Sequence, residues 1–134
     1  MKIKRIDHFV ITTTSPEKCV GFYSMLGFKP KVDGNRIELF ALDFKINVHV
    51  IGKELFPHAQ NVTPGSADLC FEVEGSLDEV ISEITAAGLS IEHEPSIRTG
   101  TFGKMTSVYL RDPDGNLIEL SQYSETETNP SEMG

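Results

Sequence analysis

The 134-residue chain has no tryptophan, only two cysteines and no long hydrophobic run. Because about 18 consecutive apolar residues are needed to cross a bilayer, no segment is expected to span a membrane. Cys19 and Cys70 cannot form the disulfide framework of a small secreted domain, and their spacing fits no zinc knuckle. We therefore expect two free, buried thiols in a cytoplasmic protein.

Positive charge is also scarce in this sequence. Twelve Lys and Arg against twenty Asp and Glu give a formal net charge of −8. Binding to phosphate backbones requires clustered Lys and Arg, so nucleic acids are excluded as partners and anionic membrane surfaces are disfavoured. A hydrophobic content of 39% and a charged content of 24% are typical of a folded globular domain.

The first half of the chain predicts a strand, a helix and three further strands. Residues 6–12 form a β-rich run, and Ser15-Pro16-Glu17 then begins a helix with a capping serine and a proline at N1. Gly27 ends this helix as a glycine at C′ would. The three strands that follow are expected at 28–32, 36–42 and 45–51, with a hairpin turn at Asp33-Gly34.

The second half repeats this order. A strand is expected at 67–73, and Ser76 then caps a helix that ends at Gly88. Further strands are expected at 90–94, 105–111 and 116–122, with a hairpin turn at Asp112-Pro113-Asp114-Gly115. The βαβββ order thus occurs twice with a period of about sixty residues. The sequence predicts one α+β domain over 1–123, made of module 1 (1–52) and module 2 (67–123), followed by a polar tail at 124–134.

Four side chains that can bind a metal occupy equivalent places in the two halves. When His8 is matched with Asp68, the apolar residues that follow each of them also match. Because strand side chains alternate between faces, the apolar residues face the helix, and His8 and Asp68 face the other way. The same alternation leaves His49 and Glu119 on that second face. Two imidazoles and two carboxylates form a donor set suited to Mn, Fe, Co, Ni or Zn.

Several segments of the sequence have the character of family motifs. They are Ile6-Asp7-His8-Phe9-Val10-Ile11, Gly21-Phe22-Tyr23-Ser24-Met25-Leu26-Gly27-Phe28, Ile46-Asn47-Val48-His49, Pro64-Gly65-Ser66-Ala67-Asp68-Leu69-Cys70-Phe71 and Asp112-Pro113-Asp114-Gly115-Asn116-Leu117-Ile118-Glu119-Leu120. Through them the chain resembles the vicinal oxygen chelate superfamily, also called the glyoxalase, bleomycin-resistance and extradiol-dioxygenase superfamily. The resemblance covers residues 1–123. It implies tandem βαβββ modules whose curved mixed sheet cups a metal or ligand site, helices on the outer face, and a homodimer.

The resemblance also implies a metal site and a chemistry. The metal positions of the family fall on His8, His49, Asp68 and Glu119, whereas glyoxalase I-like members carry His, Glu, His, Glu in that order. Asp68 is then either a direct ligand or a carboxylate that orients a ligating histidine. The implied function is a divalent-metal-dependent enzyme of the lyase or isomerase type. It acts on a small hydroxy-carbonyl or dicarbonyl substrate, with Glu119 as the catalytic residue that moves a proton.

The expected substrate pocket contains Arg98, Lys104 and Tyr109. The glycine-punctuated segment 98–104 is either a mobile loop over that pocket or an ordinary hairpin connection. Glyoxalase I-like members often carry an Arg four residues after the first metal ligand and an Asn four residues after the second. Thr12 and Lys53 stand at those positions here, which disfavours glutathione as a cosubstrate.

Two other functions remain open from the sequence. One is a non-catalytic protein that binds a drug or metabolite, although an aromatic content of 8% weighs against binding by ring stacking. The other is a ring-cleaving dioxygenase, in which His8, His49 and Glu119 would hold iron. The two remaining histidines, His58 and His93, are expected to be exposed to solvent.

Overall fold

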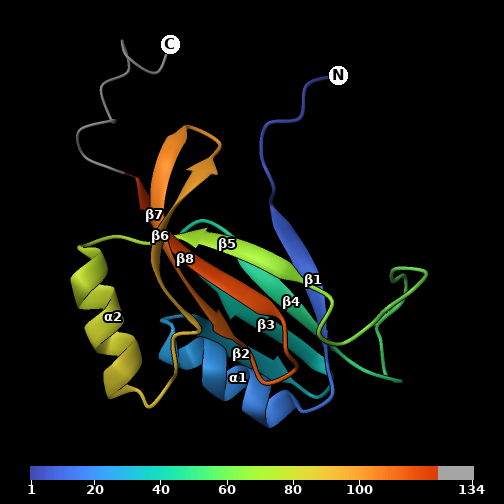
Figure 1. The fold of residues 1–134 in the computed structure, drawn as a ribbon. Helices are drawn as coiled ribbons and strands as arrows, with labels where there is room; N and C mark the ends of the chain where they lie inside the picture. The colour runs from blue at the N-terminus through green and yellow to red at the C-terminus, as the bar shows by residue number, and fades with distance from the viewer. Residues whose placement is uncertain (124–134) are drawn as a thin grey trace. The chain divides into compact units, whose positions relative to one another are not determined.

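The computed structural model describes residues 1–123 of the chain, and the tail expected at 124–134 lies outside the described residues. The chain divides into two compact units, whose helices and strands are labelled in Figure 1. Unit 1 contains Met1–Ala67 and the turn Asp112–Asn116, and unit 2 contains Asp68–Arg111 and resumes at Leu117. Each unit contains one βαβββ module with its own four-stranded mixed sheet. The predicted α+β class and the tandem modules are therefore confirmed.

Unit 1 is formed by five elements. They are β1 (His8–Thr13), α1 (Pro16–Met25), β2 (Lys29–Asp33), β3 (Arg36–Phe40) and β4 (Lys45–Val50). The sheet order is β1-β4-β3-β2, in which β1 and β4 are parallel and the other neighbours are antiparallel. The two ends of the first half, β1 and β4, thus lie side by side.

Local sequence explains the bounds of α1 and what it covers. Ser15 has an extended backbone and Pro16 opens the helix, while Gly27 has a φ of 104°, which a residue with a Cβ rarely adopts. The helix buries Tyr23 completely, and its ring packs edge-on against Phe28 at 5.7 Å between centroids. The core of unit 1 therefore lies between α1 and the apolar face of its sheet.

Unit 2 repeats this construction. Its elements are β5 (Asp68–Glu72), α2 (Leu77–Ala86), β6 (His93–Gly100), β7 (Gly103–Arg111) and β8 (Leu117–Tyr123). The sheet order is β5-β8-β7-β6, with β5 and β8 parallel. Ser76 caps α2 as expected, because its side chain accepts a hydrogen bond from the backbone N–H of Glu79 at 3.2 Å. Val80 and Ile84 of α2 are buried.

The β6–β7 hairpin differs from the expected strand at 90–94 and the expected loop at 98–104. Strand β6 begins at His93 and continues to Gly100, which pairs with Gly103, so only a two-residue turn separates the strands. The register shifts between His93 and Ser96, a segment that contains Pro95. A proline and a register shift at a sheet edge hide a strand from pattern reading, because they interrupt the regular alternation.

Three findings complete the comparison with the expected features. Cys19 is buried but Cys70 is exposed, so the expectation of two buried thiols is wrong for Cys70. His58 and His93 are exposed, as expected. Neither α1 nor α2, the helices of the described residues, is long and apolar enough to cross a membrane.

Candidate functional site

A pocket of about 780 Å³ opens in unit 2 beside Glu119. Its walls come from β5, β8 and the β6–β7 hairpin. The lining residues are Cys70, Glu72, Arg98, Thr99, Gly100, Thr101, Phe102, Met105, Tyr109, Glu119 and Tyr123. Of the residues expected to form the catalytic site and substrate pocket, Glu119, Arg98 and Tyr109 therefore share one cavity.

Two buried serines hold the Glu119 carboxylate in this pocket. The Ser107 hydroxyl donates to Oε2 of Glu119 at 2.6 Å, and the Ser121 hydroxyl donates to the same oxygen at 3.1 Å. The hydroxyl oxygens of Ser107 and Ser121 also lie 2.6 Å apart. Cys70 extends the network, since its Sγ lies 3.3 Å from the Ser121 hydroxyl. The carboxylate is thus fixed by neutral donors rather than by a cation.

Arg98 and Tyr109 form the charged and aromatic side of the pocket. The guanidinium of Arg98 lies over the Tyr109 ring, 5.4 Å from its centroid. Burial raises the pKa of Tyr109, and the nearby negative charge of Glu119 raises it further, so the phenol stays protonated at neutral pH. Lys104 does not line the pocket, and its Nζ donates to the Thr99 hydroxyl at 3.0 Å.

The two expected carboxylate ligands of unit 2, Asp68 and Glu119, lie on neighbouring strands. Asp68 begins β5 and lies opposite Leu117, whereas Glu119 lies opposite Cys70, two residues farther along. Both side chains point to the same face, roughly 7 Å apart along the strands. Carboxylate oxygens suit hard and borderline divalent cations. Asp68 and Glu119 therefore share a face of the unit 2 sheet, although only Glu119 lines the pocket.

The two histidines of unit 1 do not fit one ion together. His8 lies opposite Lys45, and His49 lies opposite Thr12, so four residues of strand separate the histidines. That offset amounts to roughly 13 Å along the sheet. They share a face, as the alternation predicts, but one ion bound by both rings would need donors a few ångströms apart. Within each unit, the described residues bring together no three His, Cys, Asp or Glu side chains able to hold a metal.

The strand register also changes the match between the two halves. In unit 2, Glu119 lies opposite the residue two positions after Asp68. In unit 1, the residue two positions after His8 is Val10, and Asn47 rather than His49 lies opposite it. The expected match of His49 with Glu119 is therefore wrong by two residues, a shift that keeps the side chain on the same face. The sequence pattern had no means of identifying Asn47.

His8 has the surroundings of a histidine that can bind metal through one nitrogen. It begins β1 and is exposed, and its Nδ1 lies 2.8 Å from Oδ1 of Asp7. Because the carboxylate contacts Nδ1, Nε2 is the nitrogen left for a metal. Of the two histidines in unit 1, His8 is thus the one whose second nitrogen is already oriented by a carboxylate.

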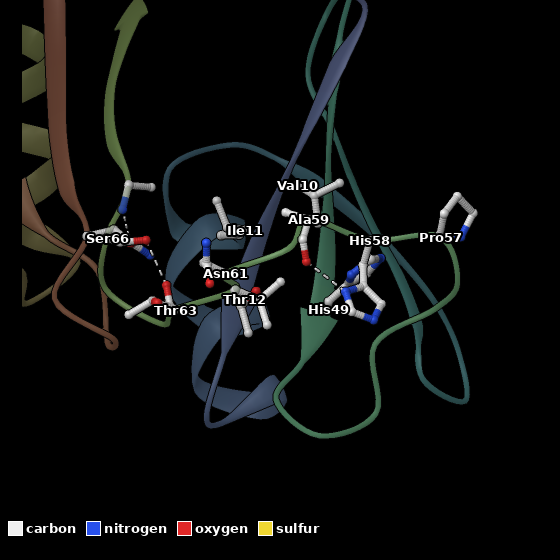
Figure 2. A pocket seen from close by; sticks show the side chains of 13 residues that line it. Val10, Ile11, Thr12, His49, Pro57, His58, Ala59, Asn61, Thr63 and Ser66 are labelled. Carbon is white, nitrogen blue, oxygen red and sulfur yellow. Dashed lines mark hydrogen bonds between the residues drawn. The ribbon is translucent and has the colours of Figure 1, made fainter.

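His49 instead faces a second pocket, of about 530 Å³, which lies within unit 1 (Figure 2). The side chain is only 8% exposed, and its Nδ1 is buried without a hydrogen-bond partner among the described residues. Burial is the main cause that lowers the pKa of His49; Glu54 raises it and His58 lowers it. The ring is therefore neutral at physiological pH. Sequence reasoning identified His49 but missed the segment 57–67 that encloses it.

Comparison with known proteins places this architecture in a family. The Glyoxalase/Bleomycin resistance protein/Dioxygenase superfamily profile matches residues 5–120. The chain is 47% identical over 125 residues to "Virulence protein STM3117" of Salmonella typhimurium, covering 92% of this chain and 87% of that protein. It is 39% identical over 128 residues to "Glyoxalase domain-containing protein RDO1" of Mycosarcoma maydis, covering 93% and 72% respectively.

Solved structures agree with this assignment. The crystal structure of STM3117 superposes with a TM-score of 0.89 at 47% identity, covering 92% of this chain and all of the other. An integron cassette protein from Vibrio cholerae gives 0.88 at 44% identity, with 92% and 98% covered. A lactoylglutathione lyase from Agrobacterium tumefaciens gives 0.71 at 19% identity, with 91% and 96% covered, and shows a shared fold. The chain therefore belongs to the Glyoxalase/Bleomycin resistance protein/Dioxygenase superfamily.

Proposed function

We propose that the protein is a glyoxalase-type lyase or isomerase that moves a proton on a small hydroxy-carbonyl or dicarbonyl substrate. The observation that carries this proposal is the placement of Glu119 in a cavity of about 780 Å³ together with Arg98 and Tyr109. A carboxylate base, a guanidinium and a protonated phenol in one cavity supply the groups that an enolisation needs.

Each of these side chains has a separate task. Glu119 removes a proton from the hydroxyl-bearing carbon next to a carbonyl and returns it to the former carbonyl carbon, while the hydroxyl proton passes to the former carbonyl oxygen. A dicarbonyl substrate reacts as its hydrate, in which added water supplies the hydroxyl group. The hydroxyls of Ser107 and Ser121 both bind Oε2, which holds the carboxylate in position for this transfer. Arg98 binds the substrate oxygens on which negative charge develops. Tyr109 can donate its hydroxyl proton to the same oxygens, because its raised pKa keeps the phenol neutral.

A divalent metal is part of this proposal, with Asp68 and Glu119 as its protein ligands in unit 2. When bound there, it would act as a Lewis acid toward the vicinal oxygens of the substrate. A role of both His8 and His49 on one ion is disfavoured by their four-residue offset in unit 1. The same offset disfavours the dioxygenase reading, because that chemistry needs two histidines and one carboxylate on a single iron.

Cys70 is not expected to act as a nucleophile in this pocket. Partial burial of the sulfur raises the pKa of the Cys70 thiol although the residue as a whole is exposed, the Ser121 hydrogen bond opposes that shift, and the charge of Glu119 adds to it. The sulfur therefore remains a thiol at neutral pH, whereas nucleophilic attack requires the thiolate. The substrate is expected to be turned over without an added thiol, in line with Thr12 and Lys53 at positions where glutathione-dependent relatives often carry Arg and Asn.

Turnover of defined substrates tests the proposal. Purified protein is supplied in turn with Mn, Fe, Co, Ni and Zn and offered 2-oxoaldehydes and 2-hydroxyaldehydes, with and without glutathione. We expect turnover of at least one compound that Glu119→Gln abolishes and that Glu94→Gln, an exposed control on β6, preserves. Full activity of the Glu119→Gln variant would contradict the proposal.

One observation favours a second function, that of a non-catalytic binding protein. Phe102, Tyr109 and Tyr123 all line the Glu119 pocket, and the rings of Phe102 and Tyr123 pack edge-on with centroids 6.1 Å apart. Aromatic rings beside a guanidinium suit the sequestration of a planar ligand. Tight binding without turnover of any tested compound, unaffected by metal removal, would favour this function over the enzyme.

A further inference from the structure

Arg98 carries a positive charge that no carboxylate in the described part of the chain offsets. The described residues of unit 2 include nine Asp and Glu but only three Lys and Arg. Of the two arginines in this unit, Arg111 donates to both carboxylate oxygens of Glu92, at 2.8 and 3.1 Å. The described residues give Arg98 no such ion pair, and its recorded contact is with the Tyr109 ring. In so acidic a unit, this charge is therefore available to an anion that the protein binds.

The Arg98 guanidinium lies beside the group proposed as the base. Arg98 pairs with Met105 across the β6–β7 hairpin, but its guanidinium lies over the Tyr109 ring, 5.4 Å from the centroid. Tyr109 in turn lies directly opposite Glu119 in the register of β7 and β8. Arg98, Tyr109 and Glu119 thus come from three neighbouring strands and line one pocket. Stacking on a ring uses the face of a guanidinium, and its N–H edges stay directed at the cavity.

The charges around the pocket favour an anion with a single negative charge. Arg98 is the one Lys or Arg among the described residues that line it, whereas Glu72 and Glu119 line it as well. A phosphate group carries about −1.5 to −2 charges at neutral pH, which one guanidinium cannot offset beside two carboxylates. A carboxylate carries one charge, and its two oxygens match two parallel N–H groups of a guanidinium. A carboxylate is therefore the anion that suits Arg98.

We infer, on the basis of the proton transfer proposed for Glu119, that the substrate is a hydroxy-oxo acid. Its carboxylate is attached to the reacting hydroxy-carbonyl pair and binds Arg98. A negative charge next to the reacting carbon opposes proton removal by the negative Glu119, and the guanidinium offsets this charge. Because a guanidinium has five N–H donors, Arg98 can bind the carboxylate and still contact the oxygen on which charge develops. Neutral hydroxy-carbonyl compounds lack the group that Arg98 binds and should be poor substrates.

Binding of compounds that lack the reacting carbonyl tests this substrate class without turnover. The full chain is titrated with 2,3-dihydroxypropanoate, its neutral amide 2,3-dihydroxypropanamide, and glycerol 3-phosphate, while NMR follows the ring signals of its three tyrosines. We expect the carboxylate to shift the Tyr109 signals in a saturable way and to bind about tenfold more tightly than the amide or the phosphate ester. Tyr23, which is fully buried in unit 1, should not respond. No shift of Tyr109 by the carboxylate, or equal or tighter binding of either other compound, would overturn the inference.

Two variants of the β6–β7 hairpin assign the preference to Arg98. Arg98→Gln should weaken binding of 2,3-dihydroxypropanoate about tenfold and leave the weak binding of the amide unchanged. Lys104→Gln is the matched control, because Lys104 carries the same charge on the same hairpin but does not line the pocket. Both side chains are exposed, so both variants should fold. A preference for the carboxylate that survives in Arg98→Gln, or that is lost in Lys104→Gln, would contradict the role of Arg98.

Turnover then separates failure of this inference from failure of the proposed function. 2-Hydroxy-3-oxopropanoate carries the carboxylate, and 2,3-dihydroxypropanal carries a neutral hydroxymethyl group in its place. We expect metal-supplied protein to convert the acid with a kcat/KM about tenfold higher than that for the neutral aldehyde. Equal or faster conversion of the neutral aldehyde would overturn the substrate class while leaving the proton transfer by Glu119 in place. Preferential binding of 2,3-dihydroxypropanoate without turnover of either compound would support the carboxylate site at Arg98 and count against the proposed function.

Discussion

A hydrogen bond connects α1 to the turn between β7 and β8, and deleting a single oxygen atom removes it. Tyr23 is fully buried, and its hydroxyl donates to Oδ2 of Asp112 at 2.7 Å. Burial and this hydrogen bond both raise the pKa of Tyr23, so the phenol remains a donor at every pH of interest. Tyr23→Phe deletes the oxygen and keeps the ring, leaving the Asp112 carboxylate with fewer donors in a buried place.

The size of the effect follows from the bonds that remain. Asp112 still accepts from the backbone N–H of Asp114 at 3.0 Å and from the backbone and side chain of Asn116 at 2.9 and 2.6 Å. A hydrogen bond to a charged group contributes about 1.5–3 kcal/mol net. With three donors left, Tyr23→Phe should lower the free energy of unfolding by about 2 kcal/mol. Urea unfolding followed by circular dichroism measures this as a lower midpoint at unchanged slope.

A matched substitution separates this bond from the general cost of losing a phenol. The hydroxyl of Tyr123 accepts from the exposed backbone N–H of Phe102 at 3.0 Å, so Tyr123→Phe should cost less than about 1 kcal/mol. In an Asp112→Ala background, Tyr23→Phe should add little, because the acceptor is already gone. Equal losses for Tyr23→Phe and Tyr123→Phe, or a full loss in the Asp112→Ala background, would refute this reasoning.

Three further predictions concern pH, metal and substrate. Burial raises the pKa of Asp114, but hydrogen bonds from two threonines outweigh burial and hold it below its ordinary value of 3.8. This stabilisation is present above the unfolded pKa and is lost as the pH falls through the folded one, so stability should drop below about pH 4. The Asp114→Asn variant should lose less unfolding free energy between pH 7 and pH 3, as measured by urea unfolding. An unchanged dependence of the unfolding free energy on pH would contradict this prediction. Elemental analysis after dialysis should show that at most one of the variants His8→Ala and His49→Ala binds less metal than the unaltered protein. Equal losses of metal in both variants would argue against the four-residue offset between these histidines. Arg98→Ala should raise KM about tenfold with a smaller change in kcat, and an unaltered KM would exclude Arg98 from substrate binding.

The fold could be predicted from the sequence because its signals are local. The cap at Ser76, the glycine at Gly27 and the alternation of apolar residues each act within a few residues, and each is found where expected. The strand β6 was misplaced for the opposite reason. It lies at a sheet edge, contains Pro95 and changes register between His93 and Ser96, so its pattern is irregular where the strand begins.

The candidate site could be predicted only in part. The alternation of apolar and polar residues determines which face of the sheet a side chain lies on, but not which residues of neighbouring strands lie opposite each other. Side chains of a strand return to the same face every two residues, so a shift of two leaves the face unchanged. His49 therefore satisfied the expected alternation while Asn47 occupies the position that matches Glu119. The pocket around His49 depends on the contact between Ala67 and Asn116, which are 49 positions apart and leave no local pattern.

The most direct test of the central claim is proton exchange at the substrate carbon. Protein supplied with metal is incubated in deuterium oxide with a substrate that it turns over, and NMR follows deuterium at the carbon next to the carbonyl. We expect the unaltered protein and Glu94→Gln to incorporate deuterium and Glu119→Gln to lose incorporation while it still binds the substrate. Incorporation at the normal rate by Glu119→Gln would show that another group moves the proton and would contradict the role assigned to Glu119.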